Sequence, residues 1–202
     1  MDKLIGFNKP LQEQIPILTS ILSLDEHFMT VLRRLRDLDI PQDYYVMSGW
    51  PAQIVANYNA DRPLNTNVKE CDIVYWEADL SSEREQKVIK LIETALSGIN
   101  LPLDITNEAR AHLWLPDYCG IAIKPYPSIE AAITSMTETI TCLGIRLDQN
   151  DDFIVFAPFG LNDIFGDTIR PVKDSPLISE KYYTERALGK QKRFPNLKIL
   201  PY

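Results

Sequence analysis

Strand-like and helix-like segments alternate along most of this chain, and that order constrains its fold more than any other feature. The strand-like runs are rich in β-branched and aromatic residues, and amphipathic stretches separate them. We expect strands at 44–47, 71–76, 101–106, 140–147 and 153–156, and helices at 50–58, 82–96, 107–115, 128–136 and 180–192. The last two strands are predicted to pair as a hairpin. The pattern predicts an α/β (α+β) fold, in which helices flank a mixed β-sheet.

Two further helices are expected before the first strand. Residues 11–22 form a short helical pattern. Ser23 is followed three residues later by Glu26, which is a capping-box pattern and predicts the start of a second helix. We therefore expect residues 1–40 to form an N-terminal helical segment packed on the core, and residues 41–202 to form the main domain.

The composition limits the partners of this chain. Its formal net charge is −7 at pH 7, and an acidic surface repels the phosphate backbones of long nucleic acids. A nucleotide with its metal ion is not excluded. The three cysteines include no Cys-x-x-Cys pair, which argues against a zinc site or a disulfide framework. No stretch approaches the roughly 18 apolar residues of a membrane span, and the first residues do not resemble a signal peptide. We expect a cytoplasmic protein with no membrane partner; the sequence does not specify an oligomeric state.

An acidic pair lies at the entrance of the predicted strand 71–76. Side chains alternate between the faces of a strand, so Glu70 and Asp72 are expected on one face and Cys71 on the other. Two neighbouring carboxylates repel each other, and a hard cation such as Mg²⁺ relieves that repulsion. Asp104, in the next predicted strand, is placed to add a third carboxylate, and such sets serve phosphoryl displacement. The alternative is an ordinary solvated strand entrance.

Ser48 and Gly49 form a small-residue turn between a predicted strand and a predicted helix. Backbone N–H groups at a helix N-terminus bind phosphate, and small residues allow close approach. The pair is therefore a candidate phosphate-binding turn, and its alternative is a simple connection.

Together these segments resemble the bacterial nucleotidyltransferase-like family of the DNA polymerase β-type nucleotidyltransferase superfamily. The superfamily pattern is a small-residue turn, a helix, an acid-x-acid strand and a third acid on a later strand. This chain matches it with Ser48-Gly49, Glu70, Asp72 and Asp104. Further matching segments extend the similarity over most of the main domain: 72–77, 104–114, 139–147, 157–165, 170–171 and 182–195.

The resemblance implies a nucleotidyltransferase fold and the transfer of a nucleotidyl group from an NTP to an unidentified acceptor, a small molecule or a protein. It implies Mg²⁺ (or Mn²⁺) as cofactor, with Glu70, Asp72 and Asp104 as catalytic residues and metal ligands. Ser48 and Gly49 would bind the nucleotide.

Three basic residues are further candidates for nucleotide binding. Arg110 follows Asp104 closely, and a guanidinium pairs bidentately with phosphate. Arg186 and Lys190 share a face of the basic helix at 180–192, which is expected to flank the cleft. The alternative for this pair is a solvated helix face.

Asn107, His112 and Asp163 are additional cleft candidates. Asn107 stands at a strand-to-helix junction, where its ordinary role is an N-cap. His112 is either an acid, base or substrate contact, or a half-exposed helix residue. Asp163 either lines the cleft or caps a turn.

Two residues depart from the superfamily pattern. Glu70 stands where aspartate is usual, and Trp50 follows the turn where small residues are usual. These departures keep a second hypothesis open beside the enzyme: a catalytically inactive nucleotidyltransferase-fold protein that acts as a nucleotide-binding or protein-interaction module. Motifs of serine hydrolases, zinc proteases, P-loop ATPases and Rossmann dehydrogenases are absent from the sequence.

Overall fold

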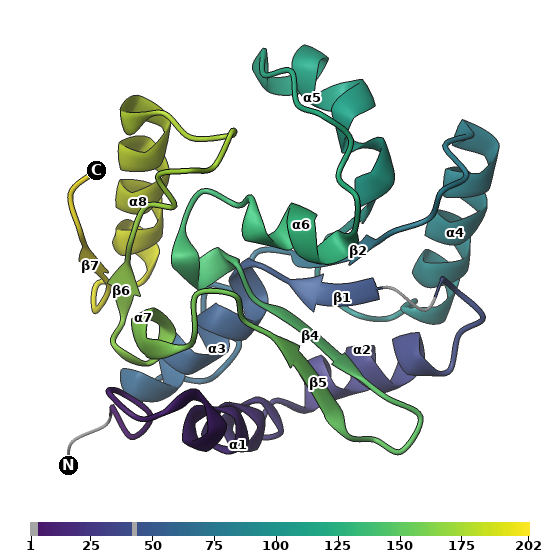
Figure 1. Ribbon diagram of the computed structural model, residues 1–202. Coiled ribbons are helices and arrows are strands. Elements are labelled where there is room, and N and C mark those ends of the chain that lie inside the picture. Colours follow the sequence, from purple (N-terminus) through teal and green to yellow (C-terminus); the bar gives the residue numbers. More distant parts are fainter. Residues whose placement is uncertain (1–3, 42–43) are drawn as a thin grey trace.

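A five-stranded mixed sheet forms the centre of the protein (Figure 1). The computed structural model describes residues 4–41 and 44–202. The strand order is β3-β2-β1-β4-β5, in which β2 and β3 are parallel and the other neighbours are antiparallel. The strands are β1 (Tyr44–Met47), β2 (Cys71–Tyr75), β3 (Leu103–Asn107), β4 (Gly144–Leu147) and β5 (Phe153–Phe156). The predicted mixed sheet and its terminal hairpin are confirmed, but the strand expected at 140–147 begins only at Gly144, because residues 139–141 form a 3₁₀ turn.

Helices cover both faces of this sheet, and a short parallel pair of strands closes the C-terminal part. The α-helices are α1 (Leu11–Leu22), α2 (Glu26–Arg36), α3 (Gly49–Asn59), α4 (Ser82–Ala95), α5 (Ala111–Cys119), α6 (Ile129–Thr134), α7 (Asn162–Phe165) and α8 (Glu180–Arg193). The 3₁₀ turns are η1 (Glu108–Arg110) and η2 (Thr139–Thr141), and the strand pair is β6 (Thr168–Ile169) with β7 (Lys198–Ile199). Within the described residues, no single helix is long and apolar enough to cross a membrane; only α1 and α2 taken together, bent by 103°, meet the length and composition required.

The alternation of β2 side chains separates two clusters of buried residues. Cys71, Ile73 and Tyr75 face the larger cluster, to which α1, α2, α3 and α4 contribute. Val74 faces the smaller cluster, which α6 covers with Ile129. The expected alternation of faces is therefore confirmed for the residues of β2 itself, and α1 and α2 share one core with the sheet.

The N-terminal helices differ from the sequence prediction in their details. Asp25, and not Ser23, is the N-cap of α2: its carboxylate accepts hydrogen bonds from the backbone N–H groups of His27 and Phe28. An ionised carboxylate is a good partner for the unpaired N–H groups of a first turn. Pro16 lies inside α1 and does not end it.

The segment after β3 was predicted as a helix at 107–115, and that prediction is wrong at both ends. Asn107 is the last residue of β3, and its side chain accepts from the N–H of Ala109 to start η1. Helix α5 begins only at Ala111 and continues through Pro116 to the left-handed residue Gly120. A proline removes one helical hydrogen bond without always ending the helix.

Candidate functional site

The turn between β1 and α3 brings a helix N-terminus to the acidic strand. Ser48 has φ 63° and ψ −120°, a conformation that L-residues rarely adopt. Met47 is paired with Asp72 in the sheet, so the turn that follows lies beside this carboxylate. The Gly49 N–H and the Ser48 hydroxyl both donate hydrogen bonds to Asp72. The strained turn is thus held against the acidic strand.

Asp72 and Asp104 lie directly opposite each other in the parallel register of β2 and β3. Burial raises the pKa of Asp72 to about 6, and the negative charges of Glu70 and Asp104 add to this effect. The hydrogen bonds from Gly49 and Ser48 act in the opposite direction. A cation at this position would relieve the repulsion that disfavours the ionised carboxylate.

Two carboxylates, Asp72 and Asp104, are placed to hold a divalent ion together, whereas three were predicted. Among residues 4–41 and 44–202, no three His, Cys, Asp or Glu side chains are grouped closely enough to hold a metal ion. Asp72 and Asp104 still supply hard oxygen donors, and the repulsion on Asp72 favours a cation. Mg²⁺ is commonly held by one or two carboxylates, with the remaining ligands from water and substrate phosphates. Glu70 precedes β2, outside the strand pairing.

A basic pocket lies on one side of Asp72. It combines the turn and the first part of α3 with cations from α8 and from the loop before β2. Its lining residues are Ser48, Gly49, Gln53, Lys69, Glu70, Asp72, Arg186, Gly189, Lys190 and Arg193. The structure therefore brings together Ser48, Gly49, Glu70, Asp72, Arg186 and Lys190, which the sequence had nominated separately. Four cations in one pocket suit an anionic group such as a triphosphate.

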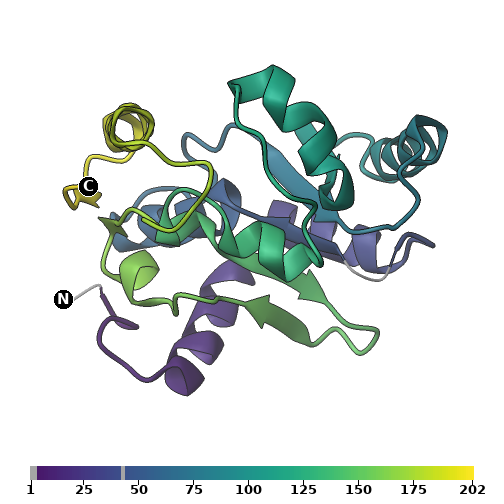
Figure 2. The same ribbon diagram turned by 45° about the horizontal axis from the view of Figure 1, so that its top comes forward.

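A second pocket, the aromatic pocket, adjoins the basic pocket and shares Ser48, Asp72 and Arg186 with it. Helices α5 and α8 stand on the same side of the molecule and both contribute to it (Figure 2). Its polar lining includes Asp72, Asp104, Glu108 and Arg186. Its apolar and aromatic lining includes Met47, Val74, Trp114, Leu115, Tyr118, Met136, Leu177 and Tyr182. Asp72 therefore stands at the boundary between a basic and an acidic, aromatic pocket.

Glu108 is a pocket residue that the sequence interpretation missed. Its side chain is only 7% exposed, and burial followed by the charge of Asp104 raises its pKa to about 7. In the sequence it resembles an ordinary acidic residue in the first turn of a helix. The only sequence feature that could have indicated Glu108 as a pocket residue is its position four residues after Asp104.

Glu138 was also missed, and it organises the cations of α8. The side chain is fully buried, and one oxygen lies 2.8 Å from the Lys190 Nζ and 3.6 Å from the Arg186 Nε. The Thr137 hydroxyl donates to the other oxygen at 2.7 Å. Burial raises the pKa of Glu138, but the charges of Lys190 and Arg186 outweigh it and the pKa is lowered. Glu138 therefore fixes two cations at the edge of the basic pocket.

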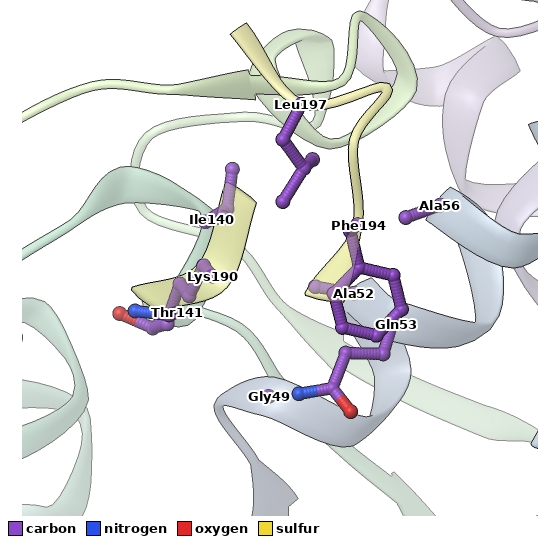
Figure 3. Close-up of a pocket in the computed structure, with 9 residues that line it drawn as sticks. All are labelled: Gly49, Ala52, Gln53, Ala56, Ile140, Thr141, Lys190, Phe194 and Leu197. Carbon is purple, nitrogen blue, oxygen red and sulfur yellow. The ribbon is translucent and has the colours of Figure 1, made fainter. Parts of the chain in front are cut away.

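A small recess behind the basic pocket shows how α8 is seated (Figure 3). Its lining includes Ala52 and Ala56 of α3, and Phe194 and Leu197 from the segment after α8. Lys190 lines both this recess and the basic pocket. The recess thus has an apolar lining contributed by α3 and by the segment after α8.

Arg110 does not join the cations of the site. Its Nε lies 3.1 Å from the Glu85 carboxylate and its Nη1 donates to the Leu80 carbonyl at 2.7 Å. Both partners belong to α4 or to the loop before it. Arg110 lines neither pocket, and its role in nucleotide binding stays a prediction.

The other cleft candidates, Asn107, His112 and Asp163, do not line either pocket. Asn107 is fully buried and bridges the backbone of Glu77, accepting from its N–H and donating to its carbonyl. Asp163 accepts hydrogen bonds from Arg170 and from the Thr139 hydroxyl. These two residues and His112, which is half-buried, lie outside the two pockets.

Trp50 does not crowd the phosphate-binding turn. It is 1% exposed and its ring meets Phe28 edge-on, with centroids 5.1 Å apart. The side chain therefore belongs to the core below the turn. One of the two departures from the superfamily pattern thus leaves the site open.

Comparison with known proteins identifies the family. A family model described as nucleotidyltransferase matches residues 33–199. The chain belongs to this nucleotidyltransferase family. No curated protein matches the chain.

Two solved structures are similar to this nucleotidyltransferase in fold. An NMR structure described as a CCA-adding enzyme head domain has a TM-score of 0.73 and 22% sequence identity, covering 91% of this chain and 96% of that chain. The complex of a CCA-adding enzyme with CTP has a TM-score of 0.58 and 18% identity, covering 91% of this chain and 43% of that one. The predicted nucleotidyltransferase fold is confirmed.

Proposed function

We propose that the protein is a metal-dependent enzyme that transfers a nucleotidyl group from an NTP to the hydroxyl of a small-molecule or protein acceptor in the cytoplasm. The observation that supports this best is the position of Asp72. Asp72 lies opposite Asp104 in the neighbouring parallel strand and accepts hydrogen bonds from the Ser48-Gly49 turn. It also lines both the basic pocket and the aromatic pocket.

The basic pocket would hold the triphosphate. Arg186, Lys190 and Arg193 of α8 and Lys69 oppose the charge of the phosphates, and the N-terminus of α3 adds its backbone N–H groups. Glu138 keeps Lys190 and Arg186 in place. The α-phosphate would then lie near Asp72, at the boundary of the two pockets.

Asp72 and Asp104 would hold Mg²⁺ or Mn²⁺ together with phosphate oxygens. When bound, the ion would neutralise the negative charge that develops on the phosphate oxygens during displacement. Glu70 contributes negative charge beside this pair and lines the basic pocket.

Displacement at phosphorus proceeds with the attacking and leaving oxygens roughly in line. Pyrophosphate leaving into the basic pocket therefore requires the acceptor hydroxyl to enter from the aromatic pocket. The hydroxyl oxygen bonds to the α-phosphorus, the bond to the β-phosphate oxygen breaks, and Asp104 accepts the proton of the hydroxyl. Asp104 suits this role because it is exposed and lines the acceptor side.

The similarity to the two CCA-adding enzyme structures, at 18% to 22% identity, supports the fold and says nothing about the acceptor of this chain. An RNA end as acceptor would meet Asp104 and Glu108 on the acceptor side and a chain of net charge −7. Like charges disfavour that encounter, so a small molecule or a protein is the better acceptor. The inactive-module hypothesis now rests on Glu70 alone, because Trp50 is buried in the core.

Calorimetry with ATP and CTP in Mg²⁺ tests the site. We expect Asp72→Ala to abolish metal-dependent nucleotide binding and Glu93→Gln, at an exposed position of α4, to leave it unchanged. Unchanged binding in Asp72→Ala would overturn the assignment. Pyrophosphate release in a screen of hydroxyl-bearing acceptors distinguishes an enzyme from a nucleotide-binding module, which would bind the nucleotide and release none.

A further inference from the structure

The aromatic pocket contains a buried carboxylate without a partner. Glu108 is 7% exposed, and within the described residues no hydrogen bond or ion pair to its carboxylate is found. Glu138, which is fully buried, has both Lys190 and Arg186 beside it. A buried carboxylate normally carries such compensation. The contrast indicates that the partner of Glu108 comes from outside the chain.

The charges around Glu108 favour a cation as that partner. Asp72 and Asp104 line the same pocket and are also acidic. Arg186 is the one cationic residue among the lining residues described, and it stands at the boundary, with its Nε 3.6 Å from Glu138. Because Asp72 and Asp104 would hold the metal ion, Glu108 is the carboxylate that a positively charged ligand on the acceptor side would meet, and Glu108 would repel an anionic ligand.

The aromatic lining of the same pocket favours a flat or apolar body on the same ligand. Trp114 and Tyr118 of α5 meet edge to face, with ring centroids 5.7 Å apart, and Tyr118 is 78% exposed. Tyr182 of α8 already has the Arg186 guanidinium over its ring at 5.4 Å. Exposed aromatic rings bind rings by stacking and cations through their faces. Leu177 and Met136 extend the apolar lining.

We propose that the acceptor is a small cationic molecule that carries a hydroxyl on a ring, with its ammonium group at Glu108 and its ring against Trp114. This inference rests on the proposed function for the direction of entry. Glu108 acts here as a specificity residue, because it selects the charge of the acceptor. Transfer to the hydroxyl follows the displacement described above and needs no other reactant.

Three probes with one phenol ring and different charges test the proposal. Tyramine is cationic, tyrosol (4-hydroxyphenethyl alcohol) is neutral, and 4-hydroxyphenylacetate is anionic. Calorimetry is done on the full chain, with and without ATP and Mg²⁺. We expect tyramine to bind about tenfold more tightly than tyrosol, as a charge-assisted contact at a buried carboxylate provides, and the anion to bind most weakly.

Matched variants locate the two contacts. Glu108→Gln keeps the shape of the side chain and should remove the preference for tyramine while leaving tyrosol unchanged. Trp114→Ala should weaken tyramine and tyrosol alike, and Glu93→Gln should change neither. Circular dichroism confirms that each variant is folded.

Equal affinity for tyramine and tyrosol, an unaltered preference in Glu108→Gln, or no binding of any probe at millimolar concentration would overturn the inference. Tighter binding of tRNA than of tyramine would overturn it as well. If the wild type shows no preference for tyramine but Asp72→Ala still abolishes nucleotide binding, this inference is wrong and the proposed function stands. A wild-type protein that binds no nucleotide removes the proposed function instead.

Discussion

Replacing Glu108 by glutamine should change how the stability of the protein depends on pH. Burial and the charge of Asp104 raise the pKa of Glu108 from 4.5 to about 7. Between these values the folded state binds more protons than the unfolded state, so the contribution of Glu108 to stability is full below about pH 4.5 and is lost as the pH rises through about 7. Glutamine has nearly the same shape and does not titrate.

The expected size of the effect follows from the shift. Each pKa unit corresponds to about 1.36 kcal/mol, so the shift from 4.5 to about 7 amounts to roughly 3 kcal/mol. Relative to the wild type, Glu108→Gln should therefore gain up to roughly 3 kcal/mol of unfolding free energy between about pH 4 and about pH 8. The comparison of two proteins at each pH cancels the titration of the shared groups that do not interact with Glu108.

Urea unfolding over this pH range, in EDTA and without nucleotide, measures the difference. EDTA is needed because a metal ion at Asp72 and Asp104 would change the charge near Glu108. Glu93→Gln, which removes an exposed carboxylate from α4, should show a nearly constant difference from the wild type. A Glu108→Gln difference that is independent of pH, or that falls as the pH rises, would refute the reasoning.

Three further substitutions test other parts of the structure. Glu138→Gln should cost roughly 3–5 kcal/mol in urea unfolding, because Lys190 loses its buried counter-charge, and a wild-type midpoint would contradict this pairing. Trp50→Ala should cost roughly 3–5 kcal/mol through the cavity it leaves, without changing the affinity of the folded protein for ATP measured by calorimetry. Ser48→Gly should relieve about 1 kcal/mol of backbone strain. It should also raise the pKa of Asp72, measured by NMR titration, since the Ser48 hydroxyl is lost; an unmoved pKa would exclude that hydrogen bond.

Local sequence patterns were sufficient for the sheet and its faces. The alternation of Cys71, Asp72, Ile73 and Val74 predicted which side chains face the main core, because a strand has a period of two residues. Boundaries were less accurate where polar side chains compete for backbone groups. Asn107 could end a strand or begin a helix; in the structure it pairs with Tyr75 as the last residue of β3, and its side chain is bonded to the backbone of Glu77.

The sequence by itself therefore determined the fold class, the acidic strand and the turn before it, since these depend on contacts between residues close in the chain. The tertiary structure alone decided the register that sets Asp72 opposite Asp104 and the distant cations that share its pocket. It also decided that Arg110 is paired with Glu85 and that Glu108 lines the acceptor side. The physical reason is that partners far apart in the chain are chosen by packing and burial, for which no periodic pattern in the sequence exists.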